Sequence, residues 1–529
     1  MKVSERTFRA FWSSHAWAGA LISVILFATF FLGAFALFWE DLGRWQEPRL
    51  REASAASEAR VLELVQAEVS RRIERAPARL DVHLPDEHAP WILVGTRERE
   101  DTRQFAWIDP ATGDQLPLRS DLGYFVYLMH FLWPIPGGGY LAGIAATVLL
   151  LVLISGLVIQ LPKLLPELIR FRPHLRLRLV GSDAHKVTGV VALPFLLVVA
   201  WTGAVLCLQS AIGPLFVQTT LAGDRGALDQ AFALGPRVPR VGEPGGAPDV
   251  RSILAHAREA LPDASHRQLI FRNLGDRNAY VDVRGEQGDG LLRQTSVRLA
   301  ASDARVLFVR EPAGGSRYSR VMEALSALHF ASYGGVGLRV AYALLALMSA
   351  LCVVTGNLIW LERRRKRGHR AGDVLLARLT AGGCAGVCLA VGAVFLANQV
   401  LPDELPGRAD REHRAFYAAW IAAGVCGLAR RSAAGSARDL LFAAGGLLAL
   451  APVLDGLRNG RAPFDPRAPW HLLGPDLGLL CAGALLLGAA SLIRRLAGRG
   501  GTAPLATRSP SSDPPARLSV LPEAMGSER

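Results

Sequence analysis

The stretch SSHAWAGALISVILFATFFLGAFALFW (residues 13–39) decides the fold, because a second stretch, DAHKVTGVVALPFLLVVAWTGAVLCLQ (183–209), aligns with it without a gap. In each stretch a histidine precedes an apolar run of about the 20 residues that a helix needs to cross a bilayer. The alignment superposes four pairs: His15 on His185, Gly19 on Gly189, Gly33 on Gly203 and Ala34 on Ala204. The sequence therefore contains an internal repeat whose two halves each begin with a histidine-bearing span.

Composition excludes a single soluble domain, since the 529 residues are 51% hydrophobic and only 20% charged. The apolar residues gather in runs that predict eight membrane-spanning helices: 11–39, 137–162, 180–208, 337–361, 372–400, 415–430, 438–455 and 473–493. The first run continues to Trp39 without a small-residue cleavage site, which favours a retained anchor over a signal peptide. The predicted fold class is a multi-spanning α-helical membrane protein.

Lysine and arginine are concentrated before the first span and after the second, fourth, sixth and eighth spans. Loops of this kind stay in the cytoplasm, so both termini are predicted to be cytoplasmic. The long segments 40–125 and 209–320 then face the other compartment. The net charge of +13 is explained by these loops, so the predicted partner is the lipid bilayer and no nucleic acid is expected.

The two long segments each have the pattern of a small α+β module inserted between the spans of one repeat. Helices are predicted at 58–76 and 249–261, and strands near 78–84, 91–96, 104–109, 267–272, 278–284, 292–300 and 305–310. The predicted units are 1–39 (span one with its N-terminus), 40–136 (outer domain one), 137–208 (spans two and three with a basic loop), 209–336 (outer domain two), 337–370 (span four and a basic loop), 371–496 (four further spans) and 497–529 (a disordered cytoplasmic tail).

Four of the 12 histidines lie where a span begins, in register across the repeat: His15 and His185 at cytoplasmic ends, His130 and His329 at outer ends. A pair of imidazoles from two helices fills both axial positions of a haem iron and favours electron transfer. The quartet therefore predicts two non-covalent haems b, because no Cys-x-x-Cys-His motif for covalent attachment occurs. The alternative is that each histidine simply leaves its polar tip in the membrane interface.

Three further residues are left with open interpretations. Arg339, just inside span four, either clasps a haem propionate with two hydrogen bonds or extends its charge to the interface. His413 and His471 fall at outer ends of the later spans, where no repeat supports a role, and they are unassigned.

The chain resembles the PepSY-associated transmembrane family, which includes iron-regulated membrane proteins and di-haem ferric-siderophore reductases of Gram-negative inner membranes. The resemblance rests on six stretches: HAWAG (15–19), His130 to Gly156, DAHKVTG (183–189) with TGA (202–204), His329 to Gly356, and the PepSY-like hairpins 105–116 and 296–309. The second hairpin lacks the Asp-Pro-x-Thr-Gly turn of the first. Residues 371–496 lie outside the shared core, and the flavoprotein domain of some relatives is absent from this sequence.

The resemblance implies a transmembrane ferric-chelate reductase in the bacterial inner membrane. His15 and His185 would hold the cytoplasmic-side haem iron, and His130 and His329 the periplasmic-side iron. Electrons from a separate cytoplasmic flavin reductase or a quinol would reach a ferric siderophore or another periplasmic acceptor. Reduction releases the metal, because hard oxygen ligands bind ferrous iron less well.

Two other classes compete with this interpretation. One is a non-enzymatic PepSY membrane protein that acts in peptidase regulation or envelope assembly. The other is a transporter, which would need polar groups at mid-depth in the last four spans. Those spans consist mostly of Gly, Ala and Leu, with Asn398 and Asp455 near an end.

Overall fold

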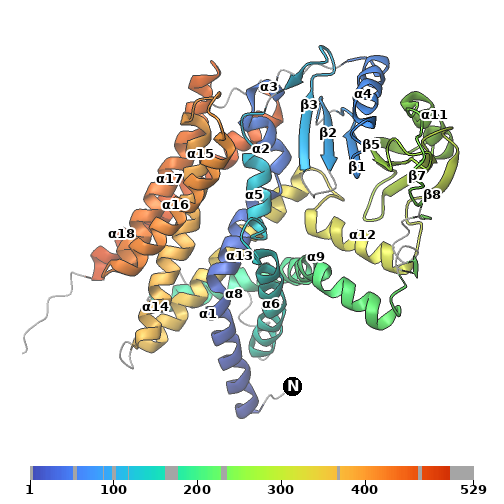
Figure 1. Ribbon diagram of the computed structural model, residues 1–529. Coiled ribbons are helices and arrows are strands. Elements are labelled where there is room, and N and C mark those ends of the chain that lie inside the picture. Colours follow the sequence, from blue (N-terminus) through green and yellow to red (C-terminus); the bar gives the residue numbers. More distant parts are fainter. Residues whose placement is uncertain are drawn as a thin grey trace, which may run out of the picture.

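A bundle of helices carries an antiparallel sheet at one end (Figure 1). The computed structural model describes residues 4–51, 56–86, 89–97, 103–116, 118–160, 177–224, 226–227, 235–236, 238–365, 370–462 and 468–500. We call the end with the sheet the sheet end. The opposite end is called the basic end, since helix α1 (Glu5–Ala36) begins there and α13 (Val336–Arg365) ends there in three arginines.

The two halves of the repeat interlock in the helical bundle. The first half contributes α1, α2 (Trp39–Gln46), α3 (Pro48–Arg51), α4 (Glu58–Ile73), α5 (Leu122–His130) and α6 (Gly138–Gln160). The second half contributes α8 (Leu177–Val191), α9 (Leu193–Thr220), α11 (Val250–Ala260), α12 (Arg317–Phe330) and α13. Helix α1 packs against both α6 and α13, while α9 packs against α6 and α8 against α13. Helices of the first half therefore pack directly against helices of the second half, α1 on α13 and α6 on α9.

Seven helical segments within the described residues are long and apolar enough to cross a membrane. They are α1, α6, α9, α13, the continuous α14 (Ala371–Leu379), η2 (Thr380–Cys384) and α15 (Ala385–Val400), then α17 (Ala433–Arg458) and α18 (Trp470–Gly500). The eighth predicted span, 415–430, falls in α16 (Arg408–Ala429), which packs along α15. Its first turns carry Arg408, Asp410, Arg411 and Glu412, so α16 is not among the seven that qualify by composition, although it packs beside α15 and α17 in the same bundle. The eighth predicted span stays a prediction.

The third predicted span, 180–208, is divided into two helices. Helix α8 ends at Val191 and α9 begins at Leu193, with Ala192 between them. Pro194 is the cause, because proline has no N–H to donate and its ring clashes with the preceding turn. His185 therefore lies on α8 against α13, and α9 continues to Thr220, beyond the predicted boundary at 208.

The two outer modules share one eight-stranded sheet, in the order β4-β3-β2-β1-β5-β6-β7-β8. The strands are β1 (Arg79–His83), β2 (Ile92–Arg97), β3 (Arg103–Ile108), β4 (Gln115–Leu116), β5 (Ser265–Arg272), β6 (Tyr280–Glu286), β7 (Gln294–Ala300) and β8 (Val306–Arg310). Antiparallel pairing of β1 with β5 places Val82 opposite Leu269 and joins the modules. The predicted strands and helices of both modules are confirmed, whereas their fusion into one sheet was not predicted.

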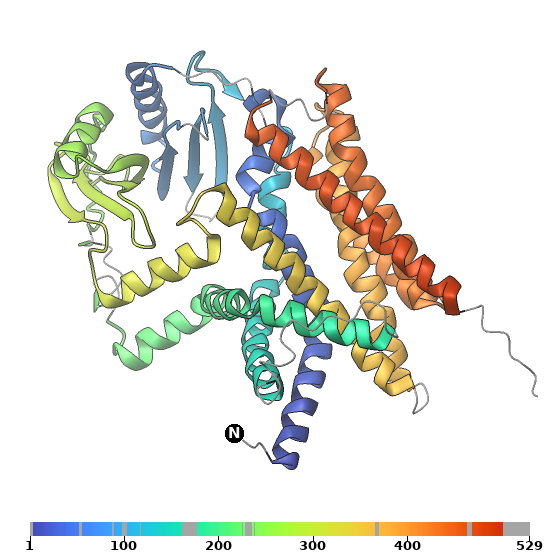
Figure 2. The same cartoon turned by 180° about the vertical axis from the view of Figure 1, so that it is seen from behind.

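One face of this sheet is apolar and is covered by α4 and α11. The core between them includes Val65 of α4, Ile253 of α11 and Phe271 of β5, all fully buried. The other face looks toward α12, which crosses beneath the sheet in both views (Figure 1 and Figure 2). Side chains alternate between the two faces along each strand, so residues between the core positions face α12.

A buried polar network attaches the C-terminal helices to the repeat at the sheet end. Glu412 of α16 is fully buried, accepts a hydrogen bond from Ser120 Oγ at 2.5 Å and pairs with Arg408. Trp45 Nε1 donates to the buried Asp476 of α18 at 2.8 Å. These contacts hold the segment that leads into α5. Of the predicted tail 497–529, residues 497–500 belong to α18, and 501–529 lie outside the described residues.

We expect Glu412→Ala to lower the free energy of unfolding by about 3–5 kcal/mol, because it leaves the buried Arg408 guanidinium without its carboxylate. Denaturant titration of the purified protein in detergent, followed by tryptophan fluorescence, measures the effect. The control is Arg430→Ala, which breaks an exposed pair with Asp439 and should cost at most about 1 kcal/mol. Equal effects of the two variants would contradict a structural role for the network.

Candidate cofactor site

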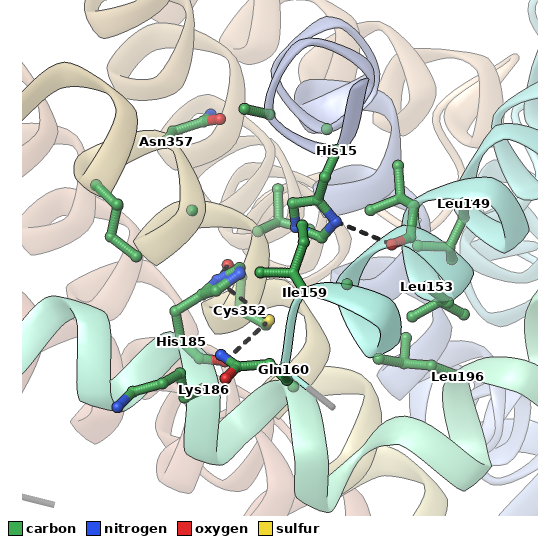
Figure 3. Close-up of a pocket in the computed structure, with 18 of the residues that line it drawn as sticks. His15, Leu149, Leu153, Ile159, Gln160, His185, Lys186, Leu196, Cys352 and Asn357 are labelled. Atoms are coloured by element: carbon green, nitrogen blue, oxygen red, sulfur yellow. Dashed lines mark hydrogen bonds between the residues drawn. The ribbon is translucent and has the colours of Figure 1, made fainter. Parts of the chain in front are cut away.

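His15 of α1 and His185 of α8 face each other across a cavity of about 290 Å³ (Figure 3). Their ring centres are 6.3 Å apart, and the ring planes are nearly perpendicular at 82°. Leu149, Leu153 and Leu196 form an apolar wall beside them. The structure thus brings together the first predicted pair in a cavity within the apolar bundle.

The Nδ1 atom of each of these two rings is hydrogen-bonded to a neighbouring helix, α6 for His15 and α13 for His185. His15 Nδ1 donates to the carbonyl of Val152 at 2.9 Å, and His185 Nδ1 donates to the carbonyl of Cys352 at 2.9 Å. Each ring also packs on the glycine that comes four residues after its carbonyl partner. A Cβ added at Gly156 would lie 3.0 Å from His15 Cε1, and one added at Gly356 would lie 3.1 Å from His185 Cε1. Because a carbonyl only accepts, the ring proton is on Nδ1 and Nε2 remains available as a ligand.

The second predicted pair meets near the sheet end. His130 ends α5, His329 lies in the last turn of α12, and their ring centres are 6.1 Å apart at an interplanar angle of 40°. His130 Nδ1 donates to the carbonyl of Thr29 at 2.7 Å, and the ring packs on Gly33, where an added Cβ would lie 2.8 Å away. The first pair's arrangement is repeated here: a carbonyl four residues before a glycine orients the ring.

His329 departs from this pattern in one atom. Its Nδ1 lies 2.8 Å from Thr202 Oγ1 and its ring packs on Gly203. The Thr202 hydroxyl donates to the carbonyl of Val198 at 2.7 Å, so it accepts the proton of His329 Nδ1. All four imidazoles therefore hold their proton on Nδ1 and share one tautomer.

The spacing within both pairs fits two imidazoles on opposite sides of one metal ion. A metal–imidazole bond is about 2 Å long and the ring centre lies about 1.1 Å beyond the bonded nitrogen, so such centres are about 6 Å apart. The observed 6.3 and 6.1 Å match this value. The described residues offer no group of three or more His, Cys, Asp or Glu side chains around a metal position. The remaining ligands would have to come from a cofactor, as they do in haem.

The cavity also leaves space for a flat ring beside the histidines. Gly19 and Gly189 follow His15 and His185 by one helical turn and line the same cavity. A Cβ at Gly19 would meet nothing within 4 Å, and at Gly189 it would meet only the Cys352 thiol at 3.5 Å. The residues present therefore fit a haem between His15 and His185.

The two pairs lie at opposite ends of α1. Gly33, which supports His130, follows His15 by 18 residues. At 1.5 Å per residue this corresponds to about 27 Å along the helix axis. Gly203 follows His185 by the same interval in α8 and α9. The repeated spacing places one imidazole pair near each end of the apolar bundle.

Other predicted residues lie elsewhere or have other partners. Arg339 donates to Asp41 Oδ2 at 3.3 Å, and the prediction that it binds a haem propionate stays a prediction. His413 donates from Nε2 to Asp121 Oδ1 at 2.8 Å and stacks on Phe125 with ring centres 4.0 Å apart. His413 therefore joins α5 to α16, a structural role that was not predicted.

Sequence reasoning missed the cations and the supporting groups of the site. Lys186 and Arg363 line the cavity of His15 and His185, a position that was predicted for neither of them. The repeated glycines Gly156 and Gly356 were noted as part of the repeat without a function. Their place in the repeat, in each case after Ser or Thr, was the available signal.

We expect Thr202→Val to weaken haem binding at the His130–His329 pair by about 10–100-fold, because it removes the acceptor that orients His329. Haem titration of the apoprotein, followed by absorbance, measures both sites separately if their affinities differ. Thr202→Ser keeps the hydroxyl and should restore wild-type affinity. Wild-type affinity in the valine variant would show that Thr202 has no part in orienting the ring.

The interlocked repeat, the inserted sheet and the paired imidazoles define a duplicated helical membrane protein with an extramembrane α+β module. Residues 12–363 match the family described as the PepSY-associated TM region. This match covers more than half of the chain, and the chain belongs to that family, as the sequence resemblance indicated.

A similar protein is found in Pseudomonas aeruginosa. It is 30% identical over 367 residues, which cover 66% of this chain and 89% of the relative. The relative is described as uncharacterized, so it shows the extent of the shared region without adding an activity.

Proposed function

We propose that this protein is a di-haem b cytochrome of the bacterial inner membrane that passes electrons from the cytoplasmic side to a periplasmic acceptor. The observation that supports this most strongly is the pair of imidazoles near each end of α1, each with ring centres about 6 Å apart. Each pair would hold one haem through its two imidazoles, and the haem would supply one-electron transfer. The metal ligands would be His15 and His185 at the basic end, and His130 and His329 at the sheet end.

The chain's own residues supply binding, orientation and exclusion of water. The Nδ1 hydrogen bonds fix the orientation of each ring and leave Nε2 to bind the haem iron. Apolar side chains such as Leu149 and Leu196 keep the cavity dry, which lowers the cost of holding a neutral macrocycle there. Lys186, which pairs with the buried Asp183 at 3.1 Å, and Arg363, which lies over the Trp12 ring, line the cavity where propionate carboxylates would lie.

The proposed direction of electron transfer is based on the positive charge at the basic end. Arg363, Arg364 and Arg365 end α13 at the basic end, and short loops rich in such residues remain in the cytoplasm. On this basis the proposal has the sheet in the periplasm and both chain termini in the cytoplasm. The donor would then be a separate cytoplasmic flavin reductase or a membrane quinol.

The acceptor that suits the family and the chemistry is a ferric siderophore. Its hard oxygen ligands hold ferric iron tightly and ferrous iron far less well, so one electron releases the metal. The activity would be that of a transmembrane ferric-chelate reductase.

Visible absorption tests the proposal. The purified protein should show Soret and alpha bands of b-type haem that sharpen on reduction, with two haems per chain by pyridine haemochrome assay. A preparation without such bands, from cells supplied with iron and haem precursors, would remove the cytochrome. The non-enzymatic role in peptidase regulation or envelope assembly would then be preferred.

A further inference from the structure

A second cavity, of about 520 Å³, lies between the polar face of the sheet and α12. Its floor is a row of residues paired across five neighbouring strands. The row runs from His83 to Gln268, Arg284, Ser296 and Arg310. Because paired residues point to the same side of a sheet, the row presents its polar groups together to the cavity. The face of the sheet toward α12 therefore carries hydrogen-bonding side chains, whereas the opposite face carries the apolar core.

The charges around this cavity do not cancel. Each carboxylate in the lining has an arginine partner: Asp282 with Arg298 at 2.6 Å, Glu323 with Arg310 at 2.6 Å, and Glu286 with Arg293 at 3.1 Å. Arg267 pairs with Asp86, which lies outside the lining. Arg284, in the middle of the row, makes no hydrogen bond or direct ion pair within the described part of the chain, and the residue is exposed. The carboxylates of Asp282 and Asp81 act on its charge only at longer range, and each has its own arginine partner. The cavity therefore has a cation available for an anionic ligand.

The roof of the cavity leads to the outer histidine pair. Ser319, Met322, Glu323 and Ser326 of α12 line it at the spacing of one helical face. His329 continues this face one turn later, about 4.5 Å along the helix axis from Ser326. A ligand in the cavity would lie beside the helix that holds one of the proposed haem ligands.

We propose that this cavity binds a net-negative iron chelate whose oxygen donors are carboxylates, with Arg284 as its main cationic contact. The inference rests on the proposed function, since it assigns the charge class of the electron acceptor. The acceptor takes one electron from the cytoplasmic donor named above, ferric iron becomes ferrous, and no bond to the protein is made or broken. An arginine in a partly enclosed polar cavity discriminates by charge because its guanidinium cannot be neutralised by deprotonation.

A redox-inert probe separates binding from electron transfer. Gallium(III) citrate carries the charge of the ferric complex, and calorimetric titration of the full-length protein in detergent measures its affinity. We expect binding that weakens about tenfold or more in Arg284→Gln. A neutral trihydroxamate chelate of gallium should bind at least tenfold more weakly than gallium citrate, and citrate alone should also bind more weakly.

The matched control is Arg277→Gln, which removes an exposed arginine paired with Glu243 on the same module but outside the cavity. It should bind gallium citrate as the wild type does. Unchanged affinity in Arg284→Gln, equal binding of the neutral chelate, or equal binding of citrate alone would overturn the inference. Haem content of Arg284→Gln should equal that of the wild type, so a failure of the cytochrome proposal would appear in the spectrum and not in this titration.

Discussion

Purified His185→Ala protein is expected to contain one haem per chain, against the two proposed for the wild type. The substitution removes one of two imidazoles whose ring centres are 6.3 Å apart, and His15 alone cannot close both axial positions. The remaining haem, at His130 and His329, should keep its spectrum but should no longer be reduced by a donor on the basic end. Pyridine haemochrome assay gives the stoichiometry, and stopped-flow reduction with a quinol gives the loss of transfer.

His329→Ala makes the complementary test. It should also leave one haem per chain, yet the haem at the basic end should still be reduced at the wild-type rate, and delivery to the acceptor should stop. His256→Ala is the control, since His256 is exposed on α11 and, among the described residues, bonds only to Ser252 of its own helix. If both site variants retained two haems, the pairing of these histidines would be wrong.

The repeat made much of the fold predictable. A gap-free alignment of two spans and the alternating pattern of the outer segments located the helices α4 and α11 and the strands β1 to β3 and β5 to β8. It also selected the four histidines that the structure arranges in two pairs. These features depend on local periodicity and on duplication, and both can be recognised from the sequence alone.

Features that depend on how separate segments meet were not predictable in this way. The pairing of β1 with β5 joins strands almost 190 residues apart, and no local pattern specifies that partner. The break at Ala192 depended on one proline, which hydropathy alone does not register. The distinction between His413 as a structural contact and His329 as a member of a pair required the neighbouring helices to be in place.

Substituting the glycines that contact the imidazole rings should cause as large a loss of haem as substituting the histidines. Gly356→Val should displace His185, because its Cβ would lie 3.1 Å from His185 Cε1 and its methyl groups would need further room. Gly33→Val should displace His130 more strongly, since the Cβ alone would lie 2.8 Å from the ring. We therefore expect each variant to lose one haem: Gly356→Val the one at the basic end, Gly33→Val the one at the sheet end. Haem stoichiometry and redox titration identify which site is lost.

This result would separate a ligand-positioning role from general misfolding. Valine has a higher helix propensity than glycine, so neither substitution should weaken its helix by itself. Gly337→Val tests that argument on the same helix as Gly356, because a Cβ at Gly337 meets nothing within 4 Å. It should keep two haems and wild-type thermal stability. Retention of two haems in Gly356→Val and Gly33→Val would instead show that the imidazoles can bind iron without resting on these glycines, and the close packing seen here would then have no part in holding the cofactor.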